Sequence, residues 1–355
     1  MARPAIPEAS RRRLDDTVER LRALVPDDWT VTVAHRQPDL GTISISADDG
    51  TEVTVSVMTR ERLEPRDIDR LLLPEGPTIV SAKWLSPRSR ELLRDAQIGF
   101  LDHTGNVEVR LRRPALYVRT VGSSSDPNPK PVNGPTLRGP RVWALMRTLI
   151  EVAPPYTAGD LASALGVDDG YVSRVLHALT NERLISRRQR GPVTEVHWEP
   201  LLRRLATTYS LLGSTQTANW VAPGGAEQFL RDLSSSKLKG WAVTGSFAAS
   251  RMVSVTAPEI AVVFAQDPER IADTMRLRPV RNGGNVVTAR PYDRIVFERT
   301  WKEENIVYAS PAQISMDCMT GFGRMPAEAD ALLDWMRRRV PRWQAPSLTA
   351  ATTMP

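Results

Sequence analysis

A proline-rich stretch near the middle of the sequence constrains this chain more than any other feature. Residues 121–137 contain four prolines, two glycines and almost no apolar side chains. Such a composition neither continues a helix nor pairs in a sheet. With 355 residues, the chain is also longer than one compact core normally organises. We therefore predict an extended linker at 121–137 with folded domains on both sides of it.

The segment before this linker mixes helical and strand patterns. Leu14, Val18, Leu21 and Leu24 repeat at helical spacing, which predicts an amphipathic helix. Further predicted elements are strands at 42–46 and 52–58, a buried strand at 78–82, a helix at 88–96, and strands near 99–101 and 107–111. The pattern indicates an α/β domain over residues 1–120.

Basic side chains are unevenly distributed along the chain. Lys plus Arg equal Asp plus Glu over residues 1–120, with 19 of each, whereas residues 138–210 hold 10 basic and 7 acidic side chains. Four arginines fall within residues 183–190, a stretch without an acid. The net charge of +6 permits an anionic partner, and the middle segment is where we expect it to bind.

Residues 138–210 show the pattern of a helix-turn-helix. A helix at 141–154 ends at a Pro-Pro pair, and Thr157 is placed to cap a short second helix. Gly166 supplies the left-handed turn after that helix, and Asp168 or Asp169 can cap the third.

The third helix has one apolar face and one polar face. Its apolar residues predict packing inward, and Tyr171, Ser173, Arg174 and His177 are left facing out. Residues 184–198 then predict a strand, a basic turn and a second strand, which completes a winged helix-turn-helix. The residues we predict to contact DNA are Thr157, Asp169, Gly170, Tyr171, Ser173, Arg174, His177, Arg187, Arg188 and Arg190.

This pattern has two interpretations. A helix of this width fits the major groove, where polar side chains meet base edges and wing arginines neutralise phosphates. Winged helices also serve as dimerisation or protein-docking modules, in which the arginines would only be a solvated turn. We favour DNA binding because the basic wing and the polar helix face coincide. A homodimer is expected, since paired half-sites suit one reading helix per protomer.

The order of several short motifs resembles a known family. Ala158-Gly-Asp-Leu-Ala, Gly170-Tyr-Val-Ser-Arg-Val-Leu and Val196-His-Trp-Glu-Pro-Leu-Leu are similar to the winged helix of bacterial regulators related to the AbiEi antitoxins of type IV toxin-antitoxin systems. Stretches before and after it, such as 85–107 and 241–249, resemble the flanking domains of these proteins. The resemblance implies a sequence-specific transcriptional regulator. An antitoxin that restrains a toxin enzyme is the alternative within binding proteins.

Residues 211–345 contain a series of elements that is found in one class of enzymes. Strand 241–244, the turn Gly245-Ser246, helix 247–253 and strand 259–265 follow the order of the nucleotidyltransferase fold. That chemistry needs two carboxylates on the second strand to hold magnesium. Glu259 is followed by Ile260 and Ala261, where the second acid would have to lie. We predict an inactive nucleotidyltransferase-like domain, with a nucleotidyltransferase or nuclease enzyme as the alternative from another class.

The N-terminal domain has some features of a nuclease fold. A lysine ending the strand at Lys83 is typical of restriction-endonuclease-like folds, but these need an acid two residues earlier, where Ser81 stands. Asp102 in Asp-His-Thr-Gly-Asn is ordinary turn chemistry. We predict a degenerate restriction-endonuclease-like domain over residues 1–120.

The single cysteine does not indicate a catalytic nucleophile. Cys318, between Met316 and Met319 in sequence, is expected to be a buried small hydrophobe.

Composition narrows the cellular setting and the partners. One cysteine excludes an internal disulfide framework, and four isolated histidines offer no spacing for a zinc site. The sequence has no signal-peptide h-region and no apolar run of membrane-spanning length. We expect a cytoplasmic protein without cofactor or bound metal that binds double-stranded DNA and no membrane. A toxin protein or a small effector is a further candidate partner.

Overall fold

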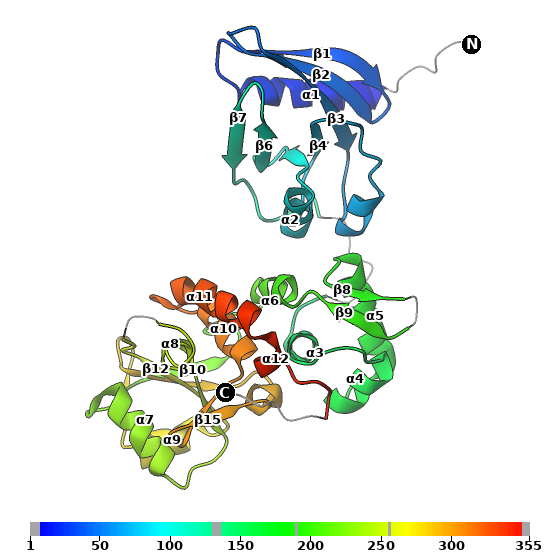
Figure 1. The fold of residues 1–355 in the computed structure, drawn as a ribbon. Helices are drawn as coiled ribbons and strands as arrows, with labels where there is room; N and C mark the ends of the chain where they lie inside the picture. Colours follow the sequence, from blue (N-terminus) through cyan, green and yellow to red (C-terminus); the bar gives the residue numbers. More distant parts are fainter. Residues whose placement is uncertain (1–7, 130–135, 189–190, 255–256, 350–355) are drawn as a thin grey trace. The chain divides into compact units, whose positions relative to one another are not determined.

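The computed structural model describes residues 8–129, 136–188, 191–254 and 257–349. It shows a mixed α/β protein built on two seven-stranded mixed sheets and one two-stranded sheet (Figure 1). The chain packs into two compact units that divide near residue 132. The central segment and the C-terminal region, predicted as separate domains, both belong to the second unit. Among the described residues, none of the helices combines the length and the apolar character needed to cross a bilayer.

The first unit contains a sheet whose strands lie in sequence order, from β1 to β7. β3, β4 and β5 run parallel to one another and the remaining pairs are antiparallel. Its elements are α1 (Glu8–Arg22), β1 (Thr30–Gln37), β2 (Leu40–Ser46), β3 (Glu52–Arg60), the 3-10 helix η1 (Pro65–Arg70), β4 (Thr78–Ala82), α2 (Pro87–Asp95), β5 (Gly99–Asp102), β6 (Val107–Leu111) and β7 (Leu116–Thr120).

The prediction for this unit is confirmed for its centre and incomplete at its edges. β4 is buried at all five positions, as predicted for residues 78–82. β1 and β7 were not predicted. Both are edge strands with mostly exposed or half-buried side chains, although β1 opens with the alternation Thr-Val-Thr-Val, which is a strand signal that the prediction missed.

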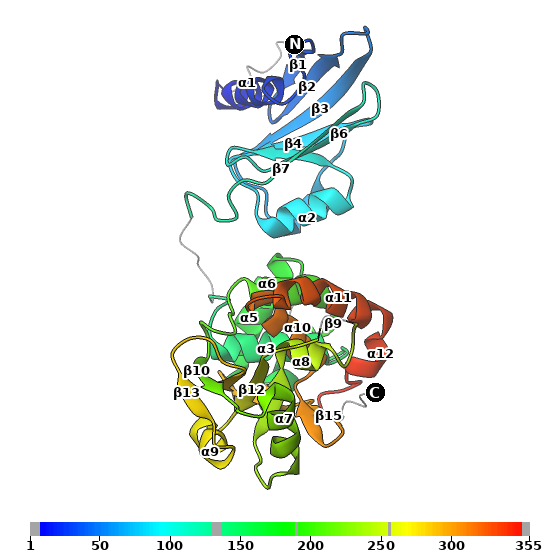
Figure 2. The same ribbon diagram turned by 90° about the vertical axis from the view of Figure 1, so that its left-hand side faces the viewer.

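Each face of this sheet is covered by a different helix. Ile79 packs in the core beneath α1, whereas its neighbour Val80 packs in the core beneath α2 and η1, because successive strand residues point to opposite faces. α1 approaches the sheet very closely at Gly41, where a Cβ atom would lie only 2.5 Å from a Leu14 methyl group. Figure 2 shows α1 and α2 on separate sides of the strands.

The first half of the predicted linker is fixed to the first unit. Residues 121–129 form no helix or strand, but the Asn106 side chain accepts from Gly122 N at 3.0 Å and donates to the Ser123 carbonyl at 3.0 Å. Arg62 forms a 2.7 Å ion pair with Asp126. Residues 122–126 of the predicted linker are therefore held to the first unit by hydrogen bonds and an ion pair.

The second unit begins with a group of helices and a hairpin that we call the helical module. The order predicted for 138–198, three helices followed by a strand pair, is confirmed, and a fourth helix follows it. The elements are α3 (Pro140–Glu151), α4 (Ala158–Leu165), α5 (Asp169–Asn181), β8 (Ile185–Arg187), β9 (Val193–Val196) and α6 (Trp198–Ala206).

The C-terminal region forms the second large sheet, with strand order β13-β10-β14-β12-β11-β16-β15. Its elements are β10 (Gln216–Val221), α7 (Gly225–Ser235), β11 (Trp241–Thr244), α8 (Gly245–Ala249), β12 (Ala261–Ala265), α9 (Pro268–Thr274), β13 (Arg278–Val280), β14 (Val286–Arg290), the 3-10 helix η2 (Arg294–Phe297), β15 (Trp301–Glu303), β16 (Ile306–Tyr308), α10 (Pro311–Thr320), α11 (Met325–Arg338) and α12 (Val340–Trp343).

The helical module and the C-terminal region share one continuous core. α10 contacts α3 and α6 of the module and also α8 and β11 of the C-terminal region (Figure 1). Met316 of α10 and Met336 of α11 are completely buried within the same cluster as Leu145 of α3. The module therefore lacks the separate core that an independently folding domain would need.

Candidate nucleic-acid interface

Side-chain caps define where α4 and α5 begin. Thr157 Oγ1 accepts from Asp160 N at 3.1 Å, and Asp160 Oδ2 accepts from Thr157 N at 2.7 Å, which is a complete capping box. These hydrogen bonds lower the pKa of the Asp160 carboxyl below its usual value. Asp168 Oδ1 accepts from Tyr171 N at 2.8 Å and so caps α5. Between the helices, Gly166 adopts the predicted left-handed conformation with φ of 65°.

The two faces of α5 differ as the sequence indicated. Its apolar side chains, Val172, Val175, Leu176 and Leu179, have no solvent exposure. On the other face Arg174 and His177 are exposed, Tyr171 and Ser173 are half-buried, and Asp169 and Gly170 at the start of the helix are exposed. The predicted contact residues on α5 therefore lie together on the solvent side of one helix.

Arg174 lies along the first turn of α5. A Cβ atom at Gly170 would come within 3.5 Å of an Arg174 Nη atom and 3.1 Å of Asp168 Oδ1. A side chain at position 170 would therefore press against the Asp168 carboxylate. The same guanidinium also acts on Tyr171: partial burial raises the pKa of the Tyr171 phenol, and the positive charges of Arg141 and Arg174 oppose that rise.

Arg141 is a basic residue of this surface that the sequence analysis did not include. It is exposed at the start of α3 and is close enough to Tyr171 to affect its ionisation. Arg141 belongs to the first predicted helix, and it was not included because only the tertiary fold brings the start of α3 near Tyr171 of α5. The signal that could have found it is an arginine in the first turn of the first helix.

The hairpin of β8 and β9 presents a mixture of charges. Arg188 is exposed, and Arg187 is half-buried with a buried Nη1 atom that no described residue accepts from. Glu195 on the facing strand is exposed and accepts from Ser186 Oγ at 3.2 Å. The wing is therefore less uniformly basic than residues 183–190 suggested. Arg190, also predicted to contact DNA, lies outside the described residues.

Thr157 differs from the other predicted contact residues. It is exposed, but its hydroxyl donates to Asp160 Oδ2 at 2.7 Å in addition to accepting the cap bond. The hydroxyl therefore uses its one donor hydrogen and one of its two lone pairs in hydrogen bonds at the start of α4.

The segment predicted to be nucleotidyltransferase-like keeps the positive φ at its glycine but not its predicted strand boundary. Gly245, predicted as part of a tight turn, is the first residue of α8 directly after β11 and has a φ of 65°. β12 begins at Ala261, so the prediction that this strand starts at Glu259 is wrong, and Glu259 is exposed outside it. A Cβ atom on Gly245 would lie 2.6 Å from Met325 Cε, so α11 covers the turn.

In the first unit, the residues weighed for nuclease chemistry have structural partners. Asp102 is buried and accepts from the backbone nitrogens of Leu85, Thr104 and Asn106, which confirms its assignment to turn chemistry. Ser81 is buried and accepts from Thr17 Oγ1 at 2.7 Å. Across the described ranges, no cluster of three His, Cys, Asp or Glu side chains could hold a metal ion.

Cys318 is completely buried in α10, and this burial raises the pKa of its thiol well above the usual value. The prediction of a buried small hydrophobe is confirmed.

Comparison with known proteins gives no further assignment. No family model matches the chain, no curated protein matches it, and no solved structure matches its fold.

Proposed function

We propose that the helical module is a winged helix-turn-helix and that the protein is a sequence-specific, double-stranded-DNA-binding transcriptional regulator. The main supporting observation is the division of α5. Its apolar face is fully buried, while Arg174 and His177 are exposed on the other face. A helix anchored in this way can place polar side chains in the major groove without losing its packing.

In this proposal α5 is the recognition helix. Arg174 can donate two hydrogen bonds to O6 and N7 of a guanine, which is the commonest specific contact of an arginine. Tyr171, Ser173 and His177 lie on the same side and contact neighbouring base edges or phosphates. Asp169 and Gly170 lie at the start of this helix, next to the proposed contact residues.

Arginines outside α5 supply contacts that do not depend on sequence. Arg188 and Arg187 on the hairpin would bind phosphates on one side of α5, and Arg141 would add a phosphate contact from the start of α3. Each neutralised phosphate releases condensed counterions, so affinity should fall steeply as salt rises.

The remaining parts of the proposal concern assembly. We infer a homodimer, because two half-sites require two recognition helices. We also infer that the C-terminal region is an inactive nucleotidyltransferase-like domain, with Met325 covering Gly245 and one carboxylate, Glu259, outside β12. The resemblance to regulators related to AbiEi antitoxins supports the same function, and a toxin partner would be an extension of it.

Fluorescence anisotropy on the protein's own promoter tests the proposal. Arg174→Ala should weaken binding to that fragment by about 1–3 kcal/mol and have less effect on a scrambled duplex. Arg188→Ala should weaken both duplexes and reduce the slope of log affinity against log salt by about 1.

The matched control is Arg270→Ala, which removes an exposed arginine from α9. It should change neither the affinity nor the salt slope. If Arg174→Ala and Arg188→Ala bind both duplexes as the control does, the proposal is wrong.

A further inference from the structure

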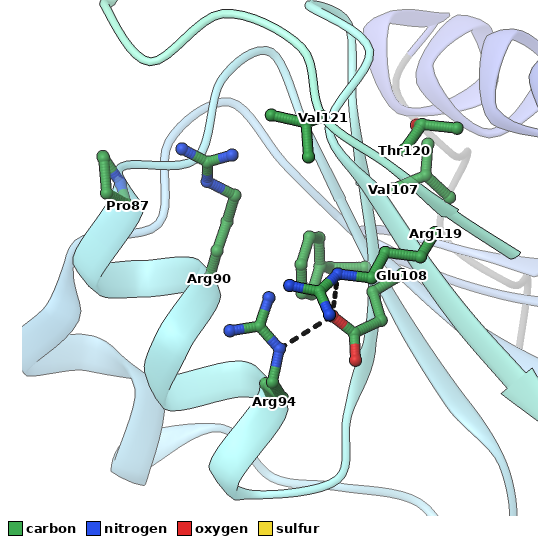
Figure 3. A pocket seen from close by; sticks show the side chains of 9 residues that line it. Pro87, Arg90, Arg94, Val107, Glu108, Arg119, Thr120 and Val121 are labelled. Atoms are coloured by element: carbon green, nitrogen blue, oxygen red, sulfur yellow. Dashed lines mark hydrogen bonds and ion pairs between the residues drawn. The ribbon is translucent and has the colours of Figure 1, made fainter. Parts of the chain in front are cut away.

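The first unit contains a pocket whose charged lining is dominated by arginine. The pocket has a volume of about 200 Å³ and lies between α2 and the outer strands β6 and β7 (Figure 3). Its charged lining residues are Arg90 and Arg94 from α2, Glu108 from β6 and Arg119 from β7. Three guanidinium groups thus face one carboxylate, and the lining has an excess of two positive charges.

The pocket exists because α2 covers only part of its face of the sheet. Apolar side chains of β3, β4 and β5 pack under α2 and η1. Towards the sheet edge the same face bears polar residues instead: Glu108 pairs in register with Arg119, and Arg110 pairs with Tyr117. On β6 and β7 this face of the sheet is therefore lined by charged side chains, and these form one wall of the pocket.

Glu108 organises two of the arginines. Its side chain is 6% exposed, and its Oε2 atom lies 2.8 Å from Arg94 Nε and 3.9 Å from Arg119 Nε. Figure 3 shows both guanidinium groups reaching this carboxylate, as the dashed lines mark. Both contacts use Nε. The terminal nitrogens of Arg94 and Arg119 are therefore not used in these two contacts with Glu108 and can donate to a ligand.

Arg90 differs from the other two arginines because one of its donor atoms is buried without a partner among the described residues. Its Nη1 atom donates to Asn106 Oδ1, but its Nε atom is buried and has no acceptor among the described residues. Burial lowers the pKa of this guanidinium, Asp102 opposes the change, and the positive charge of Arg94 adds to it. Like charges at positions i and i+4 of a helix repel. An anion between Arg90 and Arg94 would relieve this repulsion.

We propose that this pocket binds the phosphate-monoester group of a small phosphorylated molecule. Guanidinium groups match phosphate oxygens in geometry and charge. A monoester carries a charge of about −1.5 to −2 near neutral pH, which balances the excess charge of the lining, whereas a backbone phosphodiester carries about half of that. Val121, 83% exposed at the pocket, offers an apolar contact for the rest of the molecule. The site is independent of the proposed DNA contacts.

Isothermal titration calorimetry of the full-length protein tests this site. The probes are inorganic phosphate, glucose 6-phosphate and AMP, with glucose and adenosine as uncharged counterparts and a short oligodeoxythymidylate without terminal phosphates as a phosphodiester. We expect saturable binding of one equivalent of the monoesters and none of the uncharged counterparts. No binding of any monoester at about 10 mM overturns the proposal.

Four variants locate the binding. Arg94→Gln and Arg119→Gln should each weaken monoester binding by about tenfold or more, since each removes a charge-assisted hydrogen bond. Arg112→Gln removes an exposed arginine outside the pocket lining and is the matched control, with an expected change below about twofold. Glu108→Gln should tighten binding, because it removes the competing carboxylate, provided that its thermal unfolding shows a folded protein.

Two outcomes of these variants would overturn the proposal. One is equal loss in Arg112→Gln and in the pocket variants, which would indicate general attraction of anions to a basic protein. The other is tighter binding of the oligonucleotide than of every monoester, with loss of that binding in Arg94→Gln and Arg119→Gln, which would assign the pocket to single-stranded nucleic acid. Neither outcome depends on the promoter affinity, so this site and the DNA-binding proposal can fail separately.

Discussion

Helices α3 and α5 have similar amphipathic sequences, yet the structure uses them in opposite ways. On α3, ten consecutive residues from Val142 to Glu151 are buried, including the charged Arg147 and Glu151. On α5, only the apolar face is buried and the polar face meets solvent. Periodicity identifies the face that packs inward, but it does not reveal whether the opposite face is free. Only an element with one open face is suited to enter a groove.

The polar side of α3 is buried because it holds the helical module to the C-terminal region. Arg147 donates to Glu151 Oε1 at 3.0 Å, to Gln313 Oε1 at 3.1 Å and to the Glu298 carbonyl at 3.0 Å. Burial opposes the charge of Arg147, but Glu151 and Tyr292 together more than compensate, and the pKa of the guanidinium is raised. A charge pair with this many partners joins distant segments and is costly to break.

The largest expected effect is therefore on α3. Arg147→Met should lower the free energy of unfolding by about 3–5 kcal/mol, because it leaves Glu151 buried without its main partner. Urea unfolding followed by circular dichroism measures this. Arg141→Met, on the exposed start of the same helix, is the control and should change stability by less than about 0.5 kcal/mol. Equal losses in the two variants would refute the contrast between the buried and exposed parts of α3.

The next effect depends on pH and comes from Asp317 on α10. Burial raises the pKa of this carboxyl to about 7, although Thr244, Tyr209 and Gln313 donate to it and oppose the rise. Between pH of about 4 and 7 the folded state therefore binds more protons here than the unfolded state. Stability should fall with rising pH over this window, by about 1.4 kcal/mol per pH unit at most.

Asp317→Asn should remove that contribution. The difference in unfolding free energy between the wild type and the variant, measured in urea from pH 4 to 8, should change across the window and level off above about pH 7. A constant difference at all pH values would show that Asp317 does not titrate in this range.

A smaller effect is expected at the start of α4. Thr157→Ala removes the capping box and should destabilise the protein by about 1 kcal/mol. Thr157→Asn retains a capping oxygen and should recover most of that loss in the same urea titration. If Thr157→Ala were fully stable but lost promoter affinity, the residue would act on DNA rather than on the helix start.

The smallest effect on stability is expected on the open face of α5. Arg174→Ala should change the free energy of unfolding by less than about 0.5 kcal/mol, because its side chain is exposed. Its effect on promoter binding should nevertheless be the largest among the predicted contact residues. A large loss of stability would instead place Arg174 with Arg147, as part of the packing.

Local signals were sufficient for much of the fold. The cap at Thr157, the left-handed Gly166 and the buried run of β4 depend on residues close in sequence, and all three are confirmed. The inward and outward faces of α5 follow from helical periodicity in the same way. The edge strands β1 and β7 were not predicted, although β1 opens with alternating Thr-Val-Thr-Val and could have been found from its sequence.

The sequence by itself thus determined the order of elements in the helical module and the exposed residues of α5. Tertiary structure alone decided that the helical module shares its core with the C-terminal region, that Arg141 lies near Tyr171, and that arginines of α2 and β7 line one pocket. The physical reason is that these features arise between segments far apart in the chain. Each depends on which faces of the elements meet, and no periodicity within a single element contains that information.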